Sequence, residues 1–199
     1  RALVDRNLWL SRNISKRAVL GLQSSRQLYH NGRTSLYVVS NEMEKQMKIL
    51  TTGGYGLIGH NVVQRLKQLG HTISIVDNKT NYGIIPQAEL DYLMEERALK
   101  IDQHPLYTAS IETANTIDYV IRVEQPEVIV HMASFPRQKV VNANPAHGAD
   151  VMMRGLINVL ESAKRYGVRR FVYISSSMVY GDFADQVTED APCNPIGQY

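Results

Sequence analysis

The chain has 199 residues and a net charge of +3, with 44% hydrophobic and 21% charged residues. This length can bury one sizeable core, and the composition is that of an ordinary globular protein. No apolar run approaches the roughly 20 residues of a membrane helix, so we expect no membrane partner, and the single cysteine, Cys193, excludes an internal disulfide.

Most of the positive charge lies in an N-terminal arm. Residues 1–46 contain eight Lys or Arg and three Asp or Glu. Residues 47–199 contain fourteen Lys or Arg and sixteen Asp or Glu, a net charge of −2. We therefore expect no nucleic-acid partner for the larger part. The arm is rich in Arg and Ser, which fits a transit peptide; alternatively, the natural start is Met43 or Met47. In both cases we expect residues 1–46 to be a basic extension outside the core. The expected location is cytoplasmic, or an organelle if residues 1–40 are a transit peptide.

After Met47, short apolar strands alternate with helical stretches. The runs 128–130 and 171–174 are β-branched or aromatic and apolar on both faces, as in parallel sheets covered by helices. The pattern predicts strands at 47–52, 72–76, 106–109, 127–131 and 170–175, and helices at 57–69, 86–97, 114–124 and 146–166. This alternation predicts an α/β fold, a doubly wound parallel sheet of the Rossmann type, over residues 47–199.

Three glycines follow the first predicted strand at intervals of three residues: Gly53, Gly56 and Gly59. Gly53 permits a tight turn, Gly56 lets a phosphate approach the backbone, and Gly59 lets the helix lie against the strand. The first turn of the following helix offers unpaired N–H groups to an anion. The pattern therefore favours a dinucleotide pyrophosphate, and a strand-to-helix turn without a ligand is the alternative.

The second predicted strand ends at Asp77, 24 residues after Gly53. A carboxylate there can accept hydrogen bonds from both hydroxyls of an adenosine ribose and would repel a 2′-phosphate. NAD is therefore favoured over NADP, although the nearby Lys79 weakens this preference. The alternative is a solvated carboxylate at a strand end.

Two hydroxyl side chains lie near and beyond the last predicted strand. Ser176 follows it directly, and Tyr199 stands 23 residues further on. Beside a bound dinucleotide they suggest alcohol oxidation, in which the serine holds the substrate oxygen, the tyrosine takes its proton and the nicotinamide takes the hydride. His131 also ends a strand, and we interpret it as a structural histidine.

Several stretches in this order resemble the extended short-chain dehydrogenase/reductase proteins, in the NAD-dependent epimerase/dehydratase family. They are residues 52–59, 76–78, 130–134, 155–161, 175–181 and 189–199. The resemblance implies a bound NAD, a nucleotide-sugar substrate, no metal and a possible homodimer through the helix at 146–166 and the one before it. The implied cofactor-binding residues are Gly53, Gly56, Leu57, Ile58, Gly59, Asp77, Asn78, Met132 and Ala133. The implied catalytic residues are Ser176 and Tyr199.

The sequence departs from the family pattern in several places. The family's lysine four positions after the tyrosine is absent because the chain stops at Tyr199, and the C-terminal region that grips the sugar nucleotide is missing too. A tyrosine with an unperturbed pKa near 10 is only about 0.1% phenolate at pH 7, a deficit of roughly 4 kcal/mol, so we expect this polypeptide to be nearly inactive. Ser110 stands where the family has an Asp near the adenine. Ser177 and Met178 replace the Asp-Glu of the dehydratases, which disfavours dehydration.

The resemblance implies an NAD-dependent nucleotide-sugar epimerase that acts by transient oxidation of a sugar hydroxyl. A decarboxylase, dehydratase or reductase of the same family remains an alternative because it shares the first oxidation step. A non-catalytic NAD(P)-binding sensor would keep the glycines but need neither Ser176 nor Tyr199.

Overall fold

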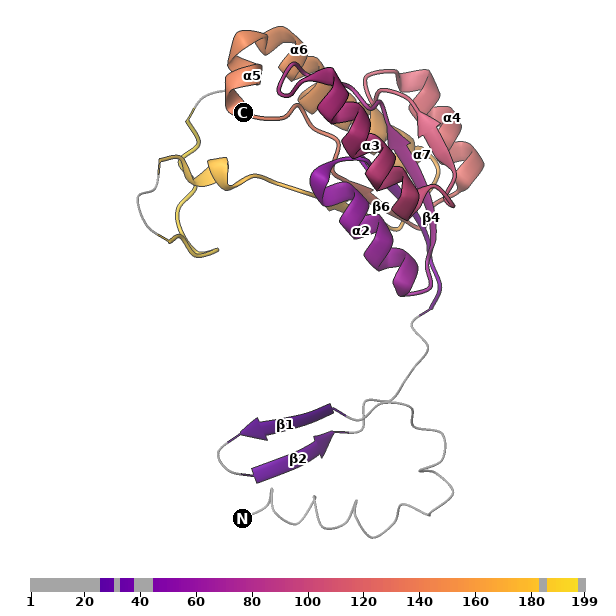
Figure 1. The fold of residues 1–199 in the computed structure, drawn as a ribbon, viewed down its shortest axis with the longest axis vertical. Helices are drawn as coiled ribbons and strands as arrows, with labels where there is room; N and C mark the ends of the chain where they lie inside the picture. The colour runs from indigo at the N-terminus through magenta and orange to yellow at the C-terminus, as the bar shows by residue number, and fades with distance from the viewer. Residues whose placement is uncertain (1–25, 31–32, 38–44, 183–185, 197–199) are drawn as a thin grey trace. The chain divides into compact units, whose positions relative to one another are not determined.

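A computed structural model describes residues 26–30, 33–37, 45–182 and 186–196. The chain divides into two compact units, residues 1–45 and residues 46–199. In the first unit, β1 (Arg26–His30) pairs antiparallel with β2 (Arg33–Tyr37), a hairpin that the sequence analysis did not predict (Figure 1).

The second unit is built on a five-stranded parallel sheet (Figure 1). Its strands are β3 (Lys48–Thr52), β4 (Thr72–Asp77), β5 (Leu106–Thr108), β6 (Val128–His131) and β7 (Arg170–Tyr173). They lie in the order β5-β4-β3-β6-β7, and every neighbouring pair is parallel. The predicted α/β fold with a doubly wound parallel sheet is thereby confirmed. Strand order reverses between β3 and β6, which is where ligands of such sheets bind.

Helices connect the strands. They are α2 (Leu57–Gln68), α3 (Gln87–Ile101), α4 (Ala114–Glu124), α5 (Gln138–Ala143), α6 (Pro145–Ala149), the π-helical η2 (Asp150–Arg154), α7 (Gly155–Arg165) and the 3₁₀-helical η3 (Ser177–Tyr180). None of the helices in the described part of the chain has both the length and the apolar character to cross a bilayer.

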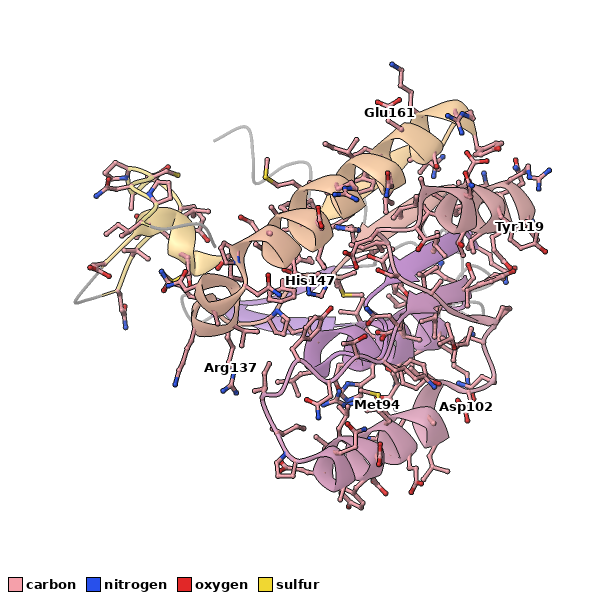
Figure 2. The ribbon with its side chains drawn as sticks, turned by 90° about the horizontal axis from the view of Figure 1, so that it is seen from above. Met94, Asp102, Tyr119, Arg137, His147 and Glu161 are labelled. Carbon is pink, nitrogen blue, oxygen red and sulfur yellow. The ribbon has the colours of Figure 1, made fainter. Side chains whose placement is uncertain are left out.

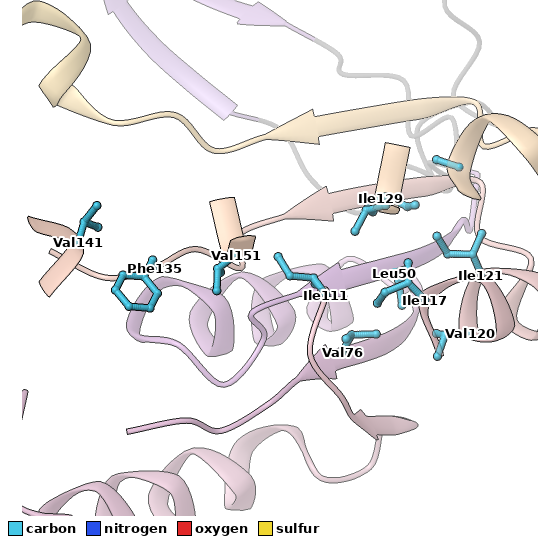
Figure 3. Close-up of a cluster of buried hydrophobic side chains, with 12 residues drawn as sticks. Leu50, Val76, Ile111, Ile117, Val120, Ile121, Ile129, Phe135, Val141 and Val151 are labelled. Atoms are coloured by element: carbon cyan, nitrogen blue, oxygen red, sulfur yellow. The ribbon is translucent and has the colours of Figure 1, made fainter. Parts of the chain in front are cut away.

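The two faces of the sheet carry separate apolar clusters. Leu50 and Ile129 face α4 and α7 and belong to the largest cluster, part of which Figure 3 shows. On the opposite face, Ile73 and Ile75 pack against α2 and α3. The central strands β3, β4 and β6 are buried along nearly their whole length, as expected for strands covered on both sides, whereas the outer strand β7 is largely exposed.

Two helical regions differ from the predictions. α3 ends at Ile101, four residues beyond the predicted end, since the intervening residues favour helix and the first proline after them is Pro105. The predicted helix at 146–166 is divided into α6, η2 and α7, and α5 lies in a segment for which no helix was predicted. Gly155, at the start of α7, packs closely on Ile111: an added Cβ would lie 2.6 Å from Ile111 Cδ1, so that side chain would have to shift.

The outer face of η2 and α7 is partly apolar. Met153 is 66% exposed and Ile157 is 56% exposed. This is the region where the family resemblance places a dimer contact, and dimerisation stays a prediction.

Gly59→Ala should destabilise the second unit. A Cβ at Gly59 would lie 2.0 Å from Gly53 O and 2.9 Å from Gly54 Cα, both backbone atoms that cannot move without opening the turn. We expect a loss of about 3 kcal/mol in unfolding free energy, measured by urea denaturation. The exposed Lys67→Ala on the same helix is the control and should change stability by less than about 0.5 kcal/mol. Equal stability of the two variants would contradict the close helix–strand contact.

Candidate functional site

The glycine turn after β3 is shaped by close backbone contacts. Gly53 has a φ of +74°, and its N–H donates to Val76 O at 2.8 Å. An added Cβ at Gly53 would lie 2.7 Å from Ala133 N, so the turn sits directly against the residues that follow β6. At Gly56, the nearest atom to an added Cβ is Gly53 O at 3.2 Å, which leaves the space beyond it open. The turn is therefore packed on its inner side and open where a ligand would approach.

The N-terminus of α2 has no side-chain cap. Gly56 is the N-cap residue, and no acidic residue occurs in the first turn. The positive end of the helix dipole and the first N–H groups are therefore not compensated by a carboxylate of their own helix, an arrangement that favours an anion. Leu57 and Ile58, which follow the cap, are 72% and 59% exposed.

Asp77 connects the glycine turn to the end of β4. Its Oδ2 accepts a hydrogen bond from the Tyr55 N–H at 2.8 Å, and its Oδ1 accepts one from the Lys79 N–H at 2.7 Å. Burial raises the pKa of Asp77, and these two hydrogen bonds oppose that rise. Each carboxylate oxygen has a second lone pair, so both can still accept a hydrogen bond from a ligand hydroxyl.

A cavity of about 520 Å³ lies at the carboxyl ends of the strands. Among the predicted cofactor-binding residues, those lining it are Gly53, Gly56, Leu57, Asp77, Asn78, Met132 and Ala133. Ile58 and Gly59 are not in the lining: Ile58 is exposed beside it and Gly59 packs against the turn. Figure 2 labels two further lining residues, Met94 of α3 and Arg137 at the start of α5. The cavity therefore gathers most of the predicted cofactor residues in one place.

The two predicted catalytic residues stand apart from this lining. Ser176 is the N-cap of η3, where its Oγ accepts a hydrogen bond from the Met178 N–H at 3.2 Å, and it does not line the cavity. Tyr199 lies outside the described residues. Their catalytic roles stay predictions.

The contribution of α3 to the cavity was not predicted from the sequence. Leu90, Met94 and Arg97 line the cavity from this helix. Their spacing of four and three residues places them on one helix face, and this shared face could have been predicted from the sequence. The sequence alone does not indicate that this face of α3 lies near the carboxyl end of β4 as well as packing against α2.

Tyr55 is the buried centre of the contacts between the glycine turn and α3. It is 1% exposed, and its hydroxyl donates to Asp102 Oδ1 at 2.7 Å. Its carbonyl accepts a hydrogen bond from Arg97 Nη1 at 2.6 Å. Burial and the Asp102 carboxylate raise the pKa of the Tyr55 phenol far above its ordinary value of 10.0, so it stays protonated and structural.

Ser110 has a local partner where the family pattern has an acid. Its hydroxyl donates to Glu112 Oε2 at 2.8 Å and accepts from the Glu112 N–H at 3.2 Å, and Ser110 lines the cavity. Among the residues that the structure describes, no three His, Cys, Asp or Glu side chains form a group that could hold a metal ion.

A buried polar pair joins β3 to β6 beneath the cavity. Thr52 Oγ1 lies 2.9 Å from His131 Nδ1 and accepts the N–H groups of Met132 and Ala133, each at 3.3 Å. Because Oγ1 accepts these amides, its own O–H donates to the histidine. Burial lowers the pKa of His131 to about 4, so the ring is neutral at pH 7. This geometry supports the interpretation of His131 as a structural residue.

The family assignment rests on a sequence comparison. Residues 49–199 match the model of the NAD dependent epimerase/dehydratase family. The chain belongs to this family. It is 31% identical over 137 residues to the protein CapI of Staphylococcus aureus and 30% identical over 156 residues to a putative UDP-glucose 4-epimerase of Methanocaldococcus jannaschii. The alignments cover 68% and 76% of this chain but 39% and 46% of those proteins, so the chain spans less than half the length of each.

Solved structures of epimerases share the fold. The UDP-glucose 4-epimerase of Thermotoga maritima with UDP-glucose matches with a TM-score of 0.64 at 27% identity, over 77% of this chain and 46% of that one. The Thermus thermophilus UDP-glucose 4-epimerase, solved with NAD, matches with a TM-score of 0.60 at 24% identity, over 75% of this chain and 45% of that one. At 24% identity, the match to the Thermus thermophilus enzyme shows a shared fold and nothing more. The predicted resemblance to the family is confirmed.

Stability should depend on pH through His131. The pKa of His131 is about 4 in the folded state against an ordinary value of 6.5, so between these values the unfolded chain binds a proton that the folded chain does not bind. The free energy of unfolding is therefore highest above pH 6.5 and decreases as the pH falls towards 4, by at most roughly 3 kcal/mol. Urea denaturation between pH 4 and 7 measures it. His131→Asn, which does not titrate, should show a smaller loss over this range, and an identical pH dependence in both proteins would contradict the assignment.

Proposed function

We propose that the complete gene product is an NAD-dependent nucleotide-sugar epimerase acting by transient oxidation of a sugar hydroxyl. The observation that carries this proposal is the cavity at the β3–β6 reversal, which combines the glycine turn, the uncapped N-terminus of α2 and the half-buried carboxylate of Asp77. The family is NAD-dependent, and several structural neighbours are UDP-sugar epimerases. These relatives support the substrate class, nucleotide sugars.

The residues of the cavity fit NAD. The open side of Gly56 and the N–H groups of α2 suit a pyrophosphate, since phosphate needs close backbone approach and donors. The spare lone pairs of Asp77 suit two ribose hydroxyls. Met132 and Ala133, placed against Gly53, would form the floor further along the cavity.

The proposed chemistry assigns separate tasks to two hydroxyl side chains. Ser176 accepts a hydrogen bond from the Met178 N–H and keeps its own O–H as a donor, which would hold the substrate oxygen. Tyr199, as a phenolate, would take the proton of the sugar hydroxyl and later return it. NAD, when bound, supplies hydride acceptance and return. The overall reaction would invert one carbon of the sugar with no net redox change.

Two alternatives remain distinguishable from this proposal. A decarboxylase, dehydratase or reductase of the same family would begin with the same oxidation and then diverge. A dinucleotide sensor would use the cavity without Ser176 and Tyr199. The presence of both side chains favours the enzyme over the sensor.

Gly56→Ala should remove dinucleotide binding while leaving the fold intact. The added methyl group meets only Gly53 O at 3.2 Å and otherwise projects into the space that a pyrophosphate would occupy. We expect NAD affinity to fall by at least about tenfold in isothermal titration calorimetry, with an unfolding midpoint close to that of the wild type. Lys67→Ala is the control and should bind NAD normally. Undiminished binding by Gly56→Ala would place the pyrophosphate elsewhere.

The reaction class is tested with nucleotide sugars and the complete gene product. NMR of the products should show a sugar epimer without net consumption of NAD. Tyr199→Phe should lower kcat by about 10²–10⁴-fold because it removes the proton acceptor, whereas Tyr180→Phe should have little effect. Release of carbon dioxide would instead support the decarboxylase, and wild-type binding of NAD without turnover of any sugar nucleotide would support the sensor.

A further inference from the structure

The glycine turn has one side chain by which it can be held, that of Tyr55. The other three residues from Gly53 to Gly56 are glycines. Glycine gives up more backbone freedom on folding than any other residue, so a turn of this composition is costly to keep in one conformation. A ligand that needs one conformation of the turn binds more tightly when the protein has already fixed that conformation. The contacts of Tyr55 therefore affect the proposed binding of a pyrophosphate.

The backbone and the ring of Tyr55 contact different parts of the fold. Its N–H donates to Asp77 Oδ2 at 2.8 Å, and its carbonyl accepts a hydrogen bond from Arg97 Nη1 at 2.6 Å. The ring is buried in the apolar cluster between the sheet, α2 and α3, and Lys79 Nζ lies 4.0 Å from the ring centroid. Lys79 itself has a positive φ of 52°. The turn is thereby held against the loop after β4 and against α3.

The hydroxyl of Tyr55 reaches a residue that lies outside the cavity lining. It donates to Asp102 Oδ1 at 2.7 Å, and Asp102, which Figure 2 labels, is the exposed C-cap residue of α3. Tyr55 and Arg97 line the cavity, whereas Asp102 does not. A hydrogen bond to a carboxylate is stronger than one between neutral groups. A side chain that does not line the cavity therefore helps to fix the turn that a cofactor in this cavity would contact.

We propose that Tyr55 is a positioning residue for the cofactor, and that its bond to Asp102 keeps the glycine turn in the conformation that receives the pyrophosphate. This inference rests on the proposed function, because it requires a dinucleotide whose pyrophosphate lies at the turn. Two acids, Asp77 and Asp102, and two bases, Lys79 and Arg97, surround Tyr55, so the cluster is balanced in charge. This balance fits a role in holding the turn better than one in binding a further anion. Affinity for NAD is then set partly from the end of α3.

The test measures NAD binding to the full chain by isothermal titration calorimetry. Tyr55→Phe keeps the buried ring and removes the donor, and Asp102→Ala removes the acceptor. Each variant should bind NAD about three- to tenfold more weakly than wild type, the order expected for the loss of one hydrogen bond. The double variant should be no weaker than the weaker single variant, because both changes break the same bond.

Tyr107→Phe is the matched control. The hydroxyl of Tyr107, on β5, donates to Glu124 Oε1 of α4, and neither residue lines the cavity. This variant loses the same kind of tyrosine–carboxylate bond from the same unit of the fold, away from the glycine turn. Its unfolding midpoint should fall to a similar extent as that of Tyr55→Phe. Its affinity for NAD should stay within about twofold of wild type, since the turn is untouched.

Two further measurements locate the effect at the turn. The Gly56 N–H donates to Gly53 O at 3.1 Å. In the absence of cofactor, this amide should exchange its hydrogen at least about threefold faster in Tyr55→Phe and Asp102→Ala than in wild type or Tyr107→Phe. Among fragments of the cofactor, 5′-ADP carries the diphosphate and should bind more weakly to Tyr55→Phe, whereas adenosine should bind as it does to wild type.

The outcomes separate the positioning role from the proposed function. If wild type binds NAD and both variants bind it equally well, the positioning role is wrong and the proposed function stands. The same conclusion follows if Tyr107→Phe weakens NAD as much as Tyr55→Phe, or if adenosine loses as much affinity as 5′-ADP. If wild type binds no NAD, the proposed function fails and the positioning role fails with it.

Discussion

The Asp77 carboxylate ties together the two loops that form the cavity. Its oxygens accept one N–H from the glycine turn, at Tyr55, and one from the loop after β4, at Lys79. Without these bonds the strained Lys79 backbone would lose its partner, and the turn would lose its link to the neighbouring strand. Asp77 also lines the cavity. One half-buried anion therefore serves both the architecture and the proposed recognition of the ribose.

Much of the sheet could be predicted because its central strands, β3, β4 and β6, are buried along nearly their whole length. β6 and β7 carry continuous apolar runs, whereas β4 opens with the alternation Thr72-Ile73-Ser74-Ile75; Gly53 lies just after β3 and Pro126 shortly before β6. The glycine turn could be predicted for a different reason. At Gly53 and Gly59 any side chain would collide with backbone, so the residue type follows directly from the geometry.

Other features depend on contacts that no local pattern reveals. The π-helical turn η2 and the short helix α5 arise where the chain passes over the cavity, and residue preference alone does not distinguish them from a loop or a continuous helix. Arg97 was overlooked because its role depends on its hydrogen bond to the Tyr55 carbonyl, 42 residues away. The roles of Ser176 and Tyr199 came from the family resemblance, and the cavity lining does not include Ser176.

The outer strand β7 has a consequence for the behaviour of this polypeptide in solution. In the described part of residues 46–199, β7 is the last strand of its sheet, and Tyr173 and Ile174 are 54% and 43% exposed. An unprotected edge with β-branched and aromatic side chains is a template on which another chain can add a strand. Val172, which is 37% exposed on β7, is a position where a lysine would disfavour such strand addition.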